Sequence, residues 1–277
     1  MLLNETSYTI PASDGINLFI RNYSLQNSNK VILIIHGLGE HSGRYLKLIQ
    51  DFNDKNISVF TIDIRGHGKS EGKRGHSPFY KQLMSDIQCF IKHVTNEFPN
   101  QKYFLYGHSL GGNLVINYSF QKNKKINGII ATAPCIKLAV EPSKIKLFMA
   151  KLFQKLIPSL RLSNGIKISR ISRNSEVIKN YINDPLNHNQ VSVQLSLDII
   201  SSGIYALENS QHITVPMLVF HGKNDELTSY SASKKLVENS GTNIKFVGFS
   251  EAYHEIHNEP EKEELLSDIC NWIDSNF

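Results

Sequence analysis

The apolar positions of this chain follow two spacings, one typical of buried strands and one typical of helices. Residues 8–23 predict a β-hairpin that turns at Asp14-Gly15. Six further β-rich runs follow, and the first five are almost continuously apolar, as strands buried on both faces are: 31–37, 59–66, 103–109, 128–134, 216–222 and 245–249. Helical patterns separate these runs. The pattern predicts an α/β fold with an eight-stranded, mostly parallel sheet.

The regular alternation stops between about residues 136 and 208, where two or three helical segments and no convincing strand are predicted. We therefore expect residues 1–277 to form one domain, with a helical cap inserted at about 136–208 between the sixth and seventh strands. Within it, residues 146–158 place apolar side chains on one helical face: Met149, Leu152, Phe153, Leu156 and Ile157. This face either packs on the core or belongs to a lid that covers an apolar pocket or touches lipid, with Lys146, Lys151 and Lys155 nearby.

Composition narrows the partners and the compartment. The formal charge of +5 comes from scattered lysines and arginines, which argues against nucleic-acid binding and leaves weak attraction to an anionic membrane open. Cys89, Cys135 and Cys270 are far apart in sequence, which suits a reducing compartment and neither a disulfide framework nor a zinc site. The first residues lack the pattern of a signal peptide, and no run of 18 apolar residues occurs. We expect a cytoplasmic protein, with peripheral membrane contact left open.

The segment Gly107-His108-Ser109-Leu110-Gly111 matches G-x-S-x-G, between a predicted strand and a predicted helix. A sharp strand-to-helix turn crowds the backbone, so small residues are needed two positions before and after the serine. The turn exposes the hydroxyl, and the helix presents its first amides to a developing anion. The motif predicts a serine hydrolase with Ser109 as its nucleophile.

A serine hydroxyl needs an imidazole to take its proton, and this type of fold supplies the partners in the order serine, acid, histidine. Asp225 follows the seventh predicted strand and is the expected acid, with Glu226 as the alternative. His254 follows the eighth strand and is the expected base, with His257 as the alternative. Such a triad needs no metal and no organic cofactor.

The transition state of ester hydrolysis also needs two backbone amides directed at one oxygen. One should come from Leu110, after the nucleophile, and the other from Leu38, in the loop after the third strand. His36 and His108 are expected to support the backbone near the site rather than transfer protons.

Five segments together resemble one family: HGLGEHSGRY (36–45), DIRGHGKSEG (63–72), GHSLGG (107–112), SRNSEV…YINDPL (172–186) and AYHEIH (252–257). They look like the monoacylglycerol lipase and lysophospholipase-like branch of the α/β-hydrolases, nearly end to end. The resemblance implies an α/β-hydrolase fold and hydrolysis of a single fatty-acyl ester to glycerol and a free fatty acid.

The resemblance also implies a small polar pocket for the glycerol group, formed by Glu40, Arg44, Tyr181 and His257. The first two also suit a plain helical ion pair, and the tyrosine suits a packed aromatic of the cap. Some animal members of the family carry inhibitor-sensitive cysteines in the cap or beside the triad. The three cysteines of this chain are expected elsewhere, so thiol sensitivity is not expected.

Other functions remain as alternatives. A lysophospholipase or general carboxylesterase is the nearest one. A serine at the nucleophile position disfavours haloalkane dehalogenases and epoxide hydrolases, which carry aspartate there. An aminopeptidase should carry clustered acids for the substrate amine, and the cap offers only sparse ones: Glu141, Glu176 and Asp184. A binding module without turnover is disfavoured because no triad member is missing.

Overall fold

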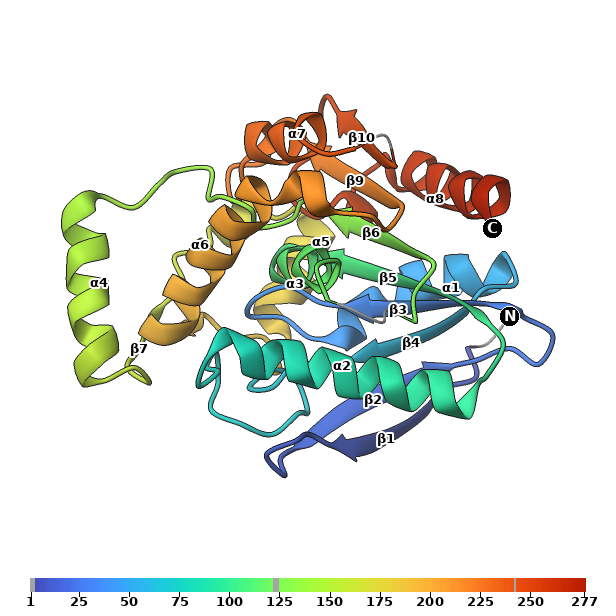
Figure 1. Cartoon of the computed structure of the whole chain (residues 1–277), viewed down its shortest axis with the longest axis horizontal. Helices are drawn as coiled ribbons and strands as arrows, with labels where there is room; N and C mark the ends of the chain where they lie inside the picture. The colour runs from blue at the N-terminus through green and yellow to red at the C-terminus, as the bar shows by residue number, and fades with distance from the viewer. Residues whose placement is uncertain (1–2, 122–124, 242) are drawn as a thin grey trace.

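The computed structural model describes residues 3–121, 125–241 and 243–277. Its centre is an eight-stranded sheet in the order β1-β2-β4-β3-β5-β6-β9-β10 (Figure 1). The strands are β1 (Thr6–Pro11), β2 (Asn17–Tyr23), β3 (Lys30–Ile35), β4 (Ser58–Ile62), β5 (Lys102–His108), β6 (Gly128–Thr132), β9 (Met217–Gly222) and β10 (Ile244–Phe249). β1 and β2 pair antiparallel, as do β2 and β4, and the other five pairings are parallel. The predicted eight-stranded, mostly parallel sheet is confirmed.

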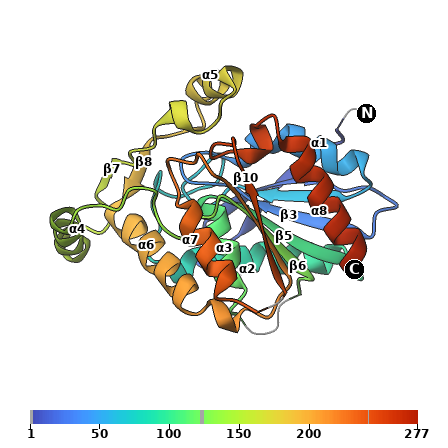
Figure 2. The same cartoon turned by 90° about the horizontal axis from the view of Figure 1, so that it is seen from above.

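Helices cover both faces of the sheet because the central strands are apolar on both sides. One core lies beneath helices α2 (Tyr80–Glu97), α3 (Leu110–Tyr118) and α7 (Tyr230–Glu238). The other core lies beneath α1 (Leu46–Asp54) and α8 (Lys262–Asn276). Seen from above, the two groups of helices lie on opposite sides of the strands (Figure 2). This layering leaves the carboxyl ends of the parallel strands open for a site.

The chain between β6 and β9, residues 133–216, is here called the insertion. It contains α4 (Lys144–Leu156), β7 (Arg161–Ser163), α5 (Ser175–Asn183), β8 (Gln190–Ser192) and α6 (Val193–Glu208). The antiparallel pair of β7 and β8 contradicts the prediction that this stretch has no strand. Each of these strands is only three residues long, which is shorter than the alternating runs by which strands are recognised in a sequence.

Helix α4 stands at the edge of the molecule, away from the sheet (Figure 1). Every residue of α4 is at least partly exposed. Of the two alternatives given from the sequence, packing of this face on the core is therefore contradicted, because α6 occupies the position against the core. Apolar side chains of α4 and its flanks face solvent instead: Val140, Ile145, Phe148, Leu152, Leu156 and Ile157. We call these six residues the α4 apolar surface.

In the described part of the chain, each helix is too short or too polar to cross a membrane.

Candidate active site

Ser109 lies in the turn between β5 and α3, with the left-handed backbone angle φ of 53° that few non-glycine residues adopt. Its amide donates to the carbonyl of Thr132 (3.0 Å), and its own carbonyl accepts from the amide of Cys135 (2.9 Å). A Cβ atom at Gly107 or Gly111 would collide with backbone carbonyls. The spacing of the G-x-S-x-G motif is thus required by the packing of this turn.

Asp225 follows β9, and its side chain is fully buried. Its Oδ1 atom accepts from the amides of Leu227 (2.7 Å) and Thr228 (3.1 Å). Its Oδ2 atom accepts from the hydroxyl of Thr228 (2.7 Å) and lies 3.0 Å from Nε2 of His221. Burial opposes ionisation, but the interactions with His254 and His221 outweigh it and hold the pKa of Asp225 well below its usual range.

His254 follows β10, and its Nδ1 atom lies 2.7 Å from Oδ2 of Asp225. This contact leaves the Nε2 atom as the ring position that can take a proton. Burial favours the neutral ring, but the nearby Asp225 carboxylate outweighs it and raises the pKa of His254. Glu226, the alternative acid, is half-exposed and pairs with Arg170 at 3.2 Å.

Ser109, Asp225 and His254 line one cavity of about 610 Å³, here called the large cavity. Much of its wall is apolar, including Leu110, Leu138, Val191, Ile199, Ile200 and Leu227. The structure therefore brings three residues from the ends of β5, β9 and β10 to a single apolar space, although they are far apart in sequence.

Leu38 and Leu110, whose backbone amides are the expected oxyanion donors, line the large cavity with Ser109. Among the described residues, neither amide has an acceptor. His36 supports this region as predicted, because its ring lies 2.7 Å from the Gly37 carbonyl and 2.9 Å from the Ile64 amide. His108 instead contacts a side chain, with Nδ1 3.1 Å from the hydroxyl of Thr132.

A second space of about 20 Å³, the small cavity, also adjoins Ser109 and His254. Glu40 and Tyr181 line it. Arg44 is buried beside it, forms an ion pair with Glu40, and stacks on the Tyr181 ring at 4.6 Å. The ion pair between residues four apart that was considered from the sequence does form, but it is buried and belongs to a network that includes Tyr181.

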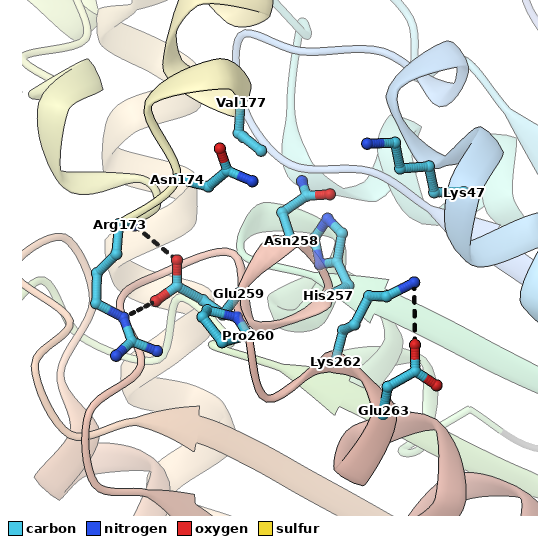
Figure 3. A pocket seen from close by; sticks show the side chains of 10 residues that line it. All are labelled: Lys47, Arg173, Asn174, Val177, His257, Asn258, Glu259, Pro260, Lys262 and Glu263. Atoms are coloured by element: carbon cyan, nitrogen blue, oxygen red, sulfur yellow. Dashed lines mark hydrogen bonds and ion pairs between the residues drawn. The ribbon is translucent and has the colours of Figure 1, made fainter.

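His257 does not line the small cavity. It lines a separate cavity of about 430 Å³, together with Lys47, Asn174 and Asn258 (Figure 3). Its ring stacks on Tyr45 at 4.9 Å, and neither ring nitrogen has a partner among the described residues. Burial lowers the pKa of His257 to about 4, so the ring is neutral at physiological pH.

Cys135 contradicts the expectation that the cysteines lie away from the triad. It lines the large cavity with Ser109, and its amide donates to the Ser109 carbonyl. The parallel pairing of β5 and β6 brings residues that follow β6 next to the turn after β5. Burial raises the pKa of the Cys135 thiol to about 12, so the thiol is protonated.

Two side chains that contact the predicted residues were not predicted from the sequence. His221, in β9, lies 2.9 Å from the Ser233 hydroxyl and 3.0 Å from Asp225. Glu255 follows His254 and binds Arg44. Their signal is position: His221 precedes Asp225 by four residues at the end of a buried strand, and Glu255 is an acid directly beside the predicted base.

These features define the protein as an α/β-hydrolase. A family model described as serine aminopeptidase, S33 matches residues 26–261, so the chain belongs to this family.

The relatives narrow the class further. The chain is 31% identical over 267 residues to monoglyceride lipase of Rattus norvegicus, covering 94% of this chain and 88% of that protein. It is 31% identical over 240 residues to phospholipase YtpA of Bacillus subtilis, covering 85% and 92%. An uncharacterised abhydrolase domain-containing protein of Dictyostelium discoideum is 36% identical over 245 residues, which are 87% of this chain and 26% of that longer protein.

Among solved structures, monoacylglycerol lipase of Paleococcus ferrophilus superposes with a TM-score of 0.83, 33% identity and full coverage of both chains. The chain is thus a monoacylglycerol lipase-like α/β-hydrolase and a carboxylic ester hydrolase.

Proposed function

We propose that the protein hydrolyses monoacylglycerols to glycerol and a free fatty acid through Ser109, His254 and Asp225. The observation that carries this proposal is the meeting of these residues in one apolar cavity, with His254 held at 2.7 Å by a buried carboxylate. Ser109 Oγ attacks the ester carbonyl while Nε2 of His254 takes its proton. The imidazolium then protonates the departing glycerol oxygen. Water, deprotonated by the same ring, hydrolyses the acyl-enzyme and restores the serine.

The amides of Leu38 and Leu110 stabilise the oxyanion in this scheme. Their lack of another acceptor in the described chain supports the role, because an amide already paired could not donate to the substrate. Loss of one such donor typically costs about 3–4 kcal/mol of transition-state stabilisation.

The two cavities suit the two halves of a monoacylglycerol. The apolar large cavity accepts the acyl chain, and the small cavity offers Glu40 and Tyr181 to alcohol hydroxyls. Arg44 orients both through its ion pair and its ring contact. His257 contributes indirectly, by supporting the ring of His108, whose centroid lies 4.9 Å from that of His257.

The test is Ser109→Ala, assayed on monoacylglycerols of graded chain length, lysophosphatidylcholine and p-nitrophenyl esters. We expect kcat on monoacylglycerol to fall by about 10⁴-fold or more, since the nucleophile is gone. A fluorophosphonate probe should label the wild-type protein and leave Ser109→Ala unlabelled. Near-normal ester hydrolysis by the variant would refute Ser109 as the nucleophile.

A lysophospholipase is the second candidate, favoured by the similarity to phospholipase YtpA. Faster turnover of lysophosphatidylcholine than of monoacylglycerol would favour it. An aminopeptidase is disfavoured because the cap acids Glu141 and Asp184 pair with Lys137 and His41 and line neither the large nor the small cavity. The acids that do line the small cavity, Glu40 and Glu255, are both bound to Arg44. A folded protein that the probe does not label would favour a binding module.

We also propose that the insertion is a cap and that the α4 apolar surface contacts lipid. Exposed apolar side chains flanked by Lys146, Lys151 and Lys155 support this, since such a surface can enter a headgroup region. Phe148→Ser with Leu152→Ser should weaken sedimentation with anionic phosphatidylglycerol vesicles and leave hydrolysis of a soluble short-chain ester unchanged. Unchanged sedimentation would contradict membrane contact at α4.

A further inference from the structure

Glu255 is a buried acid beside the base, and the scheme above gives it no part. Its two carboxylate oxygens accept hydrogen bonds from both terminal nitrogens of Arg44, at 2.7 and 2.8 Å. A third bond comes from Nδ2 of Asn258 at 2.8 Å. A bidentate contact of this kind with a guanidinium stabilises the ionised carboxylate.

Arg44 is shared with a second acid. Glu40 also forms an ion pair with it, and accepts from the Gly37 amide (2.7 Å) and the Tyr45 hydroxyl (2.8 Å). Burial opposes ionisation of Glu40, but Arg44 outweighs it and lowers the pKa of Glu40 far below its usual range. Two carboxylates thus share one guanidinium, which leaves a net charge of about −1 in a buried cluster.

Both acids of this cluster lie at the proposed catalytic site. Both Glu40 and Glu255 line the small cavity with Ser109 and His254. His108 also lines it, and burial holds the pKa of His108 well below its usual range, so this ring is neutral. The residues that line the small cavity, all in the described part of the chain, include neither lysine nor arginine.

We propose that the excess negative charge of the Glu40–Arg44–Glu255 cluster restricts the substrate to esters of uncharged alcohols, with Glu255 as the specificity-determining residue. The inference rests on the proposed function and adds to it that the alcohol carries no negative charge, so that the enzyme discriminates against esters of glycerol phosphate.

The physical reason is the different response of two alcohols to the same carboxylates. A glycerol hydroxyl donates a hydrogen bond to a carboxylate oxygen. A phosphate group brings negative charge into a buried space where like charges are weakly screened and where the nearby guanidinium of Arg44 is already bound by two carboxylates.

The experiment compares three soluble substrates, so that the binding of micelles does not affect the result. They are 1-butanoylglycerol, 1-butanoylglycerol 3-phosphate, and the dimethyl phosphotriester of the latter, which has the bulk of the phosphate without its charge. We expect the wild-type kcat/KM to be about 100-fold lower or more for the phosphate than for 1-butanoylglycerol. The kcat/KM for the phosphotriester should be much closer to that for 1-butanoylglycerol than the kcat/KM for the phosphate is.

Glu255→Gln and Glu255→Val remove the excess charge and leave the Arg44–Glu40 pair in place. In both variants the ratio of kcat/KM for 1-butanoylglycerol to kcat/KM for its phosphate should fall by about tenfold, chiefly through a lower KM for the phosphate. Glu238→Gln, on the exposed surface of α7, makes the same chemical change and should leave the ratio unchanged.

Equal wild-type turnover of 1-butanoylglycerol and its phosphate would overturn the inference and leave the proposed function intact. A ratio that neither Glu255 variant changes would overturn the role of Glu255. If neither variant folds, as judged by circular dichroism, the phosphotriester decides: turnover as poor as that of the phosphate would mean that size, not charge, selects. A wild-type protein that hydrolyses no ester would refute the proposed function itself.

Discussion

Replacing Asp225 with asparagine tests the proposed mechanism at its most buried point. The two carboxylate oxygens face the amides of Leu227 and Thr228, the Thr228 hydroxyl, and the rings of His221 and His254. An asparagine side chain has one accepting oxygen and two N–H donors. Whichever way the amide turns, its NH₂ group faces groups that themselves donate, so Nδ1–H of His254 loses its partner or the amides lose theirs.

The expected loss can be worked from this geometry. A unit charge pair about 4 Å apart at an effective dielectric constant of about 20 is worth about 4 kcal/mol, and a hydrogen bond to a charged group about 1.5–3 kcal/mol. These contributions overlap, so we expect a cost of about 5 kcal/mol when His254 becomes an imidazolium. This cost corresponds to a fall in kcat of about 10⁴-fold.

The pH profile gives the second readout. His254 accepts the serine proton only when neutral, so activity is lost as pH falls through its pKa. Because Asp225 raises that pKa above the ordinary 6.5, the acid limb of kcat/KM should lie above pH 6.5 in the wild type and move to lower pH in Asp225→Asn. Stopped-flow and steady-state assays on a soluble ester at pH 5–9 would measure both effects.

Glu226→Gln is the matched control, because it removes the carboxylate of the neighbouring residue, which pairs with Arg170 at the surface. It should keep kcat within about threefold of the wild type. A folded Asp225→Asn enzyme with near-normal kcat and an unmoved acid limb would refute the reasoning.

Three further outcomes are expected. His221→Ala should lower the free energy of unfolding in urea by about 2–3 kcal/mol, since it removes a buried partner of Asp225; wild-type stability would contradict that role. Gly111→Ala should lower the free energy of unfolding by about 1–3 kcal/mol, because its Cβ would collide with the Ile35 carbonyl. Gly241→Ala, whose Cβ would meet no neighbouring atom in the described part of the chain, should leave the midpoint of the same thermal melts unchanged. At pH 8 iodoacetamide should leave Cys135 unmodified by intact mass, because its pKa is about 12; rapid alkylation with loss of activity would show a reactive thiol.

The sheet and the nucleophile turn were predictable because the pattern and the motif are both local. Continuous apolar runs identify strands buried on both faces, and G-x-S-x-G records the steric limits of one turn. Asp225 and His254 were located by chain order alone, since the ends of parallel strands meet at one edge of the sheet.

What the sequence could not indicate depends on distant contacts. The exposure of α4 depends on α6 already filling the position against the core, which no local periodicity reports. The place of Cys135 beside Ser109 follows from strand pairing and not from spacing. Glu255 acquires its partner only because Arg44, some two hundred positions earlier, folds onto the same cluster.

The carbonyl of Gly39 accepts two hydrogen bonds from the insertion, one from the amide of His188 (2.9 Å) and one from the hydroxyl of Tyr181 (3.1 Å). Gly39 follows Leu38 directly, so the loop after β3 is fixed by residues that a ribosome adds about 140 positions later. The sheet can begin to assemble from its amino-terminal strands, but this loop must wait for the insertion. We therefore expect this loop to be completed late in folding, because contacts of long sequence separation tend to form slowly.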